Sequence, residues 1–347
     1  MRTTLAIFLT GWILLGLAAA QTTNRSITPV PDADFASYGS TSLGNFHGVN
    51  LGNMLEAPKE GAWGAALQEE YFPIIKHAGF TVIRVPICWS AHVSSAPDYT
   101  IDPAFFSRVD WVVAQAEKNN LIAILDYHND DALTKDPDTN ADRFVAIWKQ
   151  IAEHYKGEPP TILFELLNEP NGKLDAVRWN DLLSKTLSVV RASNPTRTVV
   201  VGPVQWNSIA ALPKLVLPAD DSHLLVTVHF YDPFHFTHQG AEWAQGSDKW
   251  LGTTWGTDAD KKAVTDAFDT AATWGVAHQR PMYLGEFGAY SKSPIEGRAR
   301  WTAFVARTAE SHGFPWTYWE FCSGFGAYDP KANAWRQPLL DALMPKR

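Results

Sequence analysis

The 347-residue sequence has few cysteines and no excess of basic residues. Its two cysteines, Cys88 and Cys322, are too few for a disulfide framework or for a structural zinc site. We therefore expect two separate buried thiols, although a single bridge between them stays open. There are 29 Lys and Arg against 37 Asp and Glu, and the net charge of −8 argues against a nucleic-acid partner.

Several motifs that are typical of other enzyme classes are also absent from the sequence. The sequence contains neither G-x-G-x-x-G nor G-x-x-x-x-G-K-[ST], the Gly-rich turns that bind phosphate in nucleotide-dependent proteins. It has no G-x-S-x-G elbow, and neither cysteine lies in a catalytic motif. These absences disfavour nucleotide-dependent enzymes and serine or cysteine hydrolases.

Long apolar runs are absent except at the N-terminus. Arg2, the run from Leu5 to Leu17 and the small residues Ala18–Ala20 give residues 1–20 the pattern of a secretory signal peptide. The run is short for a membrane span, so a retained anchor is only the alternative. Residues 21–42, rich in Thr, Ser, Pro and Asp, predict an N-terminal arm. We expect an exported protein with no membrane segment after cleavage.

From residue 43 to residue 347, strand-like and helix-like segments alternate. Eight apolar segments predict strands: Phe46–Leu51, Thr81–Ile87, Leu121–Tyr127, Thr161–Asn171, Thr198–Val201, Leu224–His229, Pro281–Glu286 and Pro315–Trp319. Helical spacing follows most of them: Ala65–Ala78, Phe105–Asn119, Arg143–Tyr155, Ala176–Ala192, Asp258–Trp274, Pro294–Ser311 and Pro338–Leu343. The alternation predicts an α/β fold, a (β/α)8 TIM barrel formed as a single domain by residues 43–347. A doubly wound open sheet is the alternative.

The fourth strand segment, TILFELLNEPN, ends in polar and rigid residues. Pro170 has no N–H to give to a sheet and stops the strand ladder. Asn168 and Glu169 therefore lie together at the carboxyl end of a buried strand, where barrel enzymes place their catalytic groups. The alternative is a solvated glutamate at a strand end.

Other polar residues fall at the corresponding ends of the predicted strands. Taken singly, each has a structural interpretation, such as a buried ion pair, a satisfied core histidine or an aromatic core residue. Together they predict one active-site rim. The set is Arg84, Asp126, Tyr127, His128, Asn168, Glu169, His229, Tyr231, Glu286, Trp319 and Glu320.

Two carboxylates at one rim suit glycoside hydrolysis, and Glu169 and Glu286 are the pair we select. One acid protonates the leaving oxygen while the other carboxylate attacks the anomeric carbon. Arg84 and Tyr231 are placed to hold Glu286 ionised. Asn168 can bind the sugar 2-OH, and Trp319 offers a flat face to a pyranose ring.

On the basis of these residues, the chain from about Gly44 onward resembles glycoside hydrolase family 5 (cellulase family A). The resemblance is carried by G-V-N-L-G-N-M-L-E-A-P, Arg84, His128, Asn168-Glu169-Pro170, His229-x-Tyr231 and Gly285-Glu286-Phe287-Gly288. The segments His229–Trp243 and Tyr318–Asp329 are similar to the bacterial endo-β-1,4-glucanase branch, whose members often also cut mannan.

The resemblance implies a retaining mechanism with Glu169 as acid/base and Glu286 as nucleophile, and it implies no metal and no cofactor. Six further residues match the remaining active-site positions of the family: Arg84, His128, Asn168, His229, Tyr231 and Trp319. Four match positions that contact sugar in this branch: Asn53, Glu56, His238 and Trp243. The chain departs from the pattern after His128. Related chains often have two adjacent histidines there, whereas Asn129, Asp130 and Asp131 follow here.

We therefore expect a secreted, monomeric, retaining endo-β-1,4-glucanase acting on β-glucan polysaccharides and oligosaccharides. The departure after His128 leaves β-mannan or glucomannan as the alternative substrate. A non-catalytic carbohydrate-binding barrel is a rival of another class, but both glutamates and their supporting residues are present. A metal site in Asp126–Asp131 is a further rival, although its spacing matches no familiar cage.

Overall fold

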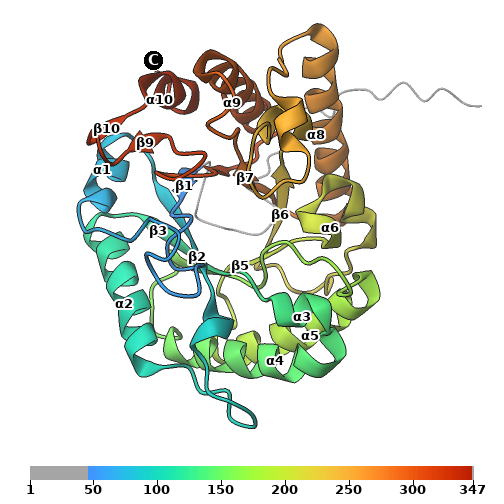
Figure 1. The fold of residues 1–347 in the computed structure, drawn as a ribbon. Coiled ribbons are helices and arrows are strands. Elements are labelled where there is room, and N and C mark those ends of the chain that lie inside the picture. Colours follow the sequence, from blue (N-terminus) through green and yellow to red (C-terminus); the bar gives the residue numbers. More distant parts are fainter. Residues whose placement is uncertain (1–45, 346–347) are drawn as a thin grey trace, which may run out of the picture. The chain divides into compact units, whose positions relative to one another are not determined.

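The computed structural model describes residues 46–345, which form one barrel domain (Figure 1). The predicted signal peptide (1–20) and arm (21–42) lie outside the described residues. Among the helices of the described part, none combines the length and apolarity needed to cross a bilayer.

Eight parallel strands close into a barrel in chain order, with β1 hydrogen-bonded to both β2 and β8. The predicted (β/α)8 fold is confirmed. The strands are β1 His47–Asn50, β2 Val82–Ile87, β3 Ile122–Tyr127, β4 Ile162–Glu165, β5 Val199–Val201, β6 Leu224–Phe230, β7 Met282–Phe287 and β8 Trp316–Tyr318.

Helices surround the barrel and lie between successive strands (Figure 1). Those longer than one turn are α1 Tyr71–His77, α2 Pro103–Lys118, α3 Asp131–Lys135, α4 Pro137–His154, α5 Ala176–Ser193, α8 Asp258–His278, α9 Ile295–Ser311 and α10 Gln337–Leu343. Short turns labelled α6 (Val204–Asn207) and α7 (Phe234–Thr237) follow β5 and β6.

The barrel interior has an apolar layer made of one side chain from each of seven strand regions. Its members are Phe46, Val82, Ile124, Leu163, Val200, Leu225 and Tyr283. Because side chains alternate along a strand, the residues two positions further on face the same interior. There the sequence changes to polar groups, with Arg84, Asp126 and Glu165 fully buried. The strands thus place a charged layer directly above an apolar floor.

Two predicted elements differ from the structure in length. The helix expected over Ala65–Ala78 begins only at Tyr71. Pro73 explains this, because a proline fits the first turn of a helix but not its interior. The strand expected over Thr161–Asn171 is regular only to Glu165. Asn168 and Glu169 therefore lie in the loop beyond it. A two-stranded hairpin, β9 (Tyr328–Asp329) with β10 (Ala334–Trp335), was not predicted.

The two cysteines are not bonded to each other. Cys88 is buried as expected, and its Sγ lies 3.3 Å from the carbonyl oxygen of Asn129. Cys322 is separate as expected but only partly buried, so the expectation of a buried thiol is met in full by Cys88 alone.

Candidate active site

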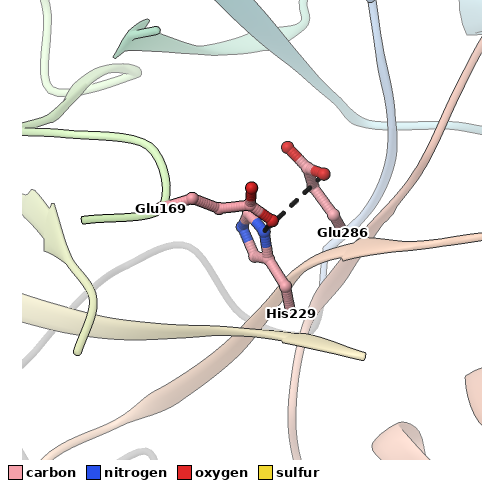
Figure 2. Close-up of side chains that lie close together, drawn as sticks. All are labelled: Glu169, His229 and Glu286. Atoms are coloured by element: carbon pink, nitrogen blue, oxygen red, sulfur yellow. Dashed lines mark hydrogen bonds and ion pairs between the residues drawn. The ribbon is translucent and has the colours of Figure 1, made fainter. Parts of the chain in front are cut away.

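Glu169, His229 and Glu286 point toward one another at the carboxyl ends of β4, β6 and β7 (Figure 2). One ligand atom from each lies within 4.8 Å of the other two. His229 Nδ1 is 2.8 Å from Glu169 Oε1 and 3.6 Å from Glu286 Oε2. Two glutamates distant in sequence therefore share one histidine nitrogen.

A β-bulge turns Glu286 into the barrel mouth. β6 and β7 are in register up to Val228 and Leu284, after which His229 pairs with Glu286 and Gly285 is the extra residue. Such a bulge breaks the in–out alternation and re-aims the next side chain. Only glycine fits at this position, because a Cβ on Gly285 would lie 2.4 Å from Thr227 Oγ1.

Glu286 is almost fully buried and receives two strong hydrogen bonds. Arg84 Nη1 donates to Oε1 at 2.7 Å, and the Tyr231 hydroxyl donates to Oε2 at 2.9 Å. A cation and a neutral donor both stabilise negative charge on a carboxylate. The geometry predicted from sequence, with Arg84 and Tyr231 flanking Glu286, is present in the structure.

Arg84 is itself held by buried acceptors. Glu165 accepts from Nε at 2.7 Å and from Nη2 at 2.8 Å, and Asp126 Oδ2 lies 3.0 Å from Nη2. Asn50 Oδ1 and Asn168 Oδ1 accept at 2.9 Å each. Every N–H direction of the guanidinium is therefore used to fix its orientation toward Glu286. Sequence reasoning missed Glu165 and Asn50; the charged residue inside the apolar run FELL was the available signal for Glu165.

Glu169 has a different environment. Its backbone is left-handed, with φ 49°, a conformation that non-glycine residues adopt mainly where surrounding structure imposes it. Burial raises the pKa of this carboxyl to about 7, although nearby His128 and Arg84 oppose the shift. About a quarter of the side chain, 24%, remains exposed. Glu169 is thus a carboxyl group with a raised pKa that solvent and ligand can reach.

His128 and Trp319 follow β3 and β8, the strands next to those that lead to Glu169 and Glu286. Asp126 Oδ2 lies 2.5 Å from His128 Nδ1, which fixes the imidazole. The ring stacks with Trp319 at 5.8 Å between centroids and an interplanar angle of 11°. Trp319 in turn packs on Gly52, where a Cβ would lie 2.9 Å from the indole. Both residues are brought to the site as predicted.

Asn53 and Glu56 form a tight turn after β1. The Glu56 carboxylate accepts from the backbone N–H groups of Asn53 and Met54, the latter at 2.8 Å. The side chain is 2% exposed, and burial raises its pKa to about 7. The structure thus uses the Glu56 side chain to hold its own turn, a role that the sequence did not indicate.

His238 and Trp243 lie in the loop after β6. His238 stacks on Phe234 at 3.9 Å and meets Tyr231 edge-on at 5.1 Å. Trp243 is 62% exposed and packs edge-on against Tyr290 at 4.8 Å. Phe325 packs against the rings of His238 and Trp243. An aromatic surface therefore runs from Tyr231 outward to Trp243. Trp243 lies at the outer end of this surface.

Two members of the sequence-derived rim have structural roles. Glu320 is fully buried and accepts backbone N–H bonds from Cys322, Ser323 and Phe325, so it faces its own turn. Asp126 Oδ2 pairs with both Arg84 and His128. The donor atoms of Glu169, His229 and Glu286 are close enough to share a cation. However, Glu286 is already bound by the Arg84 cation, which a metal would have to displace.

Comparisons with known proteins agree with this geometry. The family described as cellulase (glycosyl hydrolase family 5) matches residues 37–324. Endoglucanase H of Acetivibrio thermocellus is 38% identical over 79% of this chain, which spans 29% of that protein. Endoglucanase B of Clostridium cellulovorans is 28% identical over 84% of this chain and 71% of its own length.

Among solved structures, Thermotoga maritima Cel5A in complex with mannotriose has a TM-score of 0.85 at 46% identity and covers 86% of this chain and 97% of its own. The same enzyme has been solved with cellobiose. The matched residues span both glutamates and the loops around them. The chain therefore belongs to glycoside hydrolase family 5, the cellulase family.

Proposed function

We propose that this protein is an endo-β-1,4-glucanase that works by double displacement, with Glu286 as nucleophile and Glu169 as acid/base. The observation that carries the proposal is that Glu169 and Glu286, which have different surroundings, place carboxylate oxygens within 4.8 Å of each other. That separation suits direct attack on the sugar; inversion needs roughly 6.5–9.5 Å between carboxyl groups to admit a water. The endoglucanase names of the relatives add support for the substrate class.

In the first step, an oxygen of Glu286 bonds to the anomeric carbon while Glu169 gives its proton to the departing glycosidic oxygen. Arg84 and Tyr231 donate hydrogen bonds to the two oxygens of Glu286 before the attack. In the second step, Glu169, now a carboxylate, takes a proton from water. The water oxygen bonds to the anomeric carbon, and Glu286 departs as a carboxylate. The anomeric configuration is retained because it inverts twice.

Azide rescue of two alanine variants tests the assigned roles. On a dinitrophenyl β-cellobioside, whose leaving group needs no acid, Glu169→Ala should still form the glycosyl-enzyme, and azide should release β-glycosyl azide. Glu286→Ala has no nucleophile, so azide should attack directly and give the α-azide. The reverse pattern of products would exchange the two roles. Full turnover of unactivated glucan by either variant would refute the pair.

A β-mannan activity is the second candidate, favoured by the mannotriose complex of Thermotoga maritima Cel5A. The position after His128 distinguishes the candidates. Asn129 is exposed, has a left-handed φ of 55° and donates to the Glu56 carbonyl at 3.2 Å. Rates on barley β-glucan, lichenan, carboxymethylcellulose, mannan and glucomannan should rank glucans first. Asn129→His should change the glucan-to-mannan ratio if this position selects substrate.

Endo action, export and a monomeric state are further parts of the proposal. An endo-enzyme lowers the viscosity of carboxymethylcellulose well before many reducing ends appear. The N-terminal pattern of Arg2, Leu5–Leu17 and Ala18–Ala20 supports export, and N-terminal sequencing of protein from the culture medium tests it. Light scattering on the purified enzyme tests the monomer.

A further inference from the structure

The turn after β5 has an unusual backbone that buries one carboxamide behind the catalytic histidine. Gln205, Trp206 and Asn207 have consecutive left-handed φ values of 60°, 59° and 54°. Asn adopts this conformation readily, but Gln and Trp do so rarely. Trp206 N donates to the Pro170 carbonyl at 3.3 Å, which ties the turn to the loop carrying Glu169. Asn207 is fully buried at its end.

The Asn207 carboxamide reaches the rear of the His229 ring. Its Nδ2 lies 3.2 Å from His229 Nε2. On the other side of the ring, Nδ1 faces Glu169 Oε1 at 2.8 Å and Glu286 Oε2 at 3.6 Å. Two carboxyl groups therefore meet Nδ1, and one amide meets Nε2.

These contacts determine where the histidine proton sits. A proton on Nδ1 suits these contacts, because that N–H faces oxygens of both Glu169 and Glu286, whereas a bare lone pair would face the Glu286 carboxylate at 3.6 Å. Burial lowers the pKa of His229 to about 4, so the ring is neutral near neutral pH. A neutral ring protonated on Nδ1 has only a lone pair on Nε2, which needs a donor. The Asn207 amide nitrogen supplies it.

The carboxamide packs directly against the backbone at Gly202. A Cβ at Gly202 would lie 2.1 Å from Asn207 Oδ1, so glycine is required opposite it. Within residues 46–345, Oδ1 has no hydrogen-bond partner. A buried amide that only stabilised the fold would be expected to satisfy both ends. Here the turn directs the amide nitrogen toward His229 although the amide oxygen is left without a partner.

We propose that Asn207 is a positioning residue that fixes the tautomer of His229, so that Nδ1–H points between Glu169 and Glu286. The inference rests on the proposed function for its catalytic meaning, but the tautomer itself can be measured without activity. The charged groups that face His229 are Glu169, Glu286, Arg84 and Glu165, together with the titratable His128.

Nitrogen NMR of the intact enzyme labelled at histidine gives the first test. The His229 signals are assigned by their loss in His229→Gln. In the wild type we expect a protonated Nδ1 and an unprotonated Nε2 near neutral pH. A proton found on Nε2 would overturn the proposal whether or not the enzyme cleaves glucan. Absent turnover with the expected tautomer would instead count against the proposed function.

Three variants test the catalytic consequence. Asn207→Asp keeps the shape but replaces the donor with an acceptor, which favours a proton on Nε2. The positive ring that results lowers the pKa of Glu169, so the alkaline limb of kcat/KM moves to lower pH. Asn207→Gly keeps the left-handed backbone without the amide, and kcat should fall about tenfold, the effect of one lost hydrogen bond, with KM little changed. Gln205→Gly is the matched control, since it relaxes the same turn and leaves the amide in place.

The Gln205→Gly enzyme should keep wild-type kcat and pH profile. Thermal unfolding of all three variants shows whether each is folded. Wild-type kcat in Asn207→Gly, or an equal loss in Gln205→Gly, would show that the turn matters only structurally. If Asn207→Asp does not fold, Asn207→Gly and the NMR of the wild type still decide the question.

Discussion

At the scale of single residues, the partners of the two glutamates, not their chemical type, distinguish them. Glu169 is desolvated and its pKa is raised to about 7, so as the proposed acid it keeps its proton below that pH. We expect kcat/KM on a natural glucan to fall as pH rises through about 7. A pH profile measures this fall.

The control for that limb is the Glu169→Ala variant on a dinitrophenyl glycoside. Its glycosylation step needs no acid, so the decline near pH 7 should disappear from the burst rate. If the decline persists in this variant, it belongs to another group and the assignment of the limb to Glu169 is wrong.

Glu165 acts through Arg84, because its bidentate bond orients the guanidinium that also binds Glu286. Glu165→Gln keeps the volume but replaces one acceptor oxygen with a donor that opposes Arg84. Loss of a charge-assisted bond of about 1.5–3 kcal/mol predicts a fall in kcat of roughly 10- to 100-fold, with a smaller change in KM. Glu60→Gln is the matched control, because Glu60 makes a similar two-bond contact to Arg108 outside the site. An equal kcat loss in both variants would contradict the prediction.

Residues that act through others were the hardest to predict. Glu169 and Glu286 could be selected because each ends a predicted strand beside a breaker or a glycine. Glu165 lies inside an apolar run, where sequence does not show which side chains face the barrel interior. Asn207 depends on three left-handed residues without a glycine among them, so no turn signal marks it.

At the scale of elements, apolar runs predicted all eight strands because a parallel barrel buries both faces of each. The predicted ends of helices and strands were wrong where a local contact determines them. Pro73 delays α1, and the Gly285 bulge gives β7 its catalytic geometry. A glycine inside a strand signals a bulge, but its direction depends on the neighbouring strand.

The turn after β8 depends on one buried carboxylate. Glu320 receives N–H bonds from Cys322, Ser323 and Phe325, and burial raises its pKa to about 7. Glu320→Gln would turn an amide donor toward these N–H groups and leave at least one of them unpaired. We expect the free energy of unfolding to fall by roughly 2 kcal/mol, measured by urea denaturation. The neighbouring Ser323→Ala variant keeps the backbone N–H and should be near neutral; an equal loss there would contradict the role of Glu320.

At the scale of the whole domain, one arginine neutralises much of a buried acidic layer. Arg84 contacts Asp126, Glu165 and Glu286 above the apolar floor of the barrel. Charges inside a protein are tolerated when they are paired and hydrogen-bonded. The barrel thus supplies its own cation to balance these buried carboxylates.

The aspartates at the end of β3 and in the loop after it extend this self-neutralisation to the rim and argue against a metal requirement. Asp126 is bound by Arg84 and His128, Asp130 by Arg143 and the Tyr127 hydroxyl, and Asp131 by Lys135. Because each carboxylate has a partner from its own chain, exhaustive dialysis against a chelator should leave both activity and the melting temperature unchanged. Asp131→Asn, which loses only an exposed ion pair, should behave like the wild type. A melting temperature that falls on chelation and recovers with calcium would instead establish a cation site in this loop, and the ion pairs seen here would then describe its empty state.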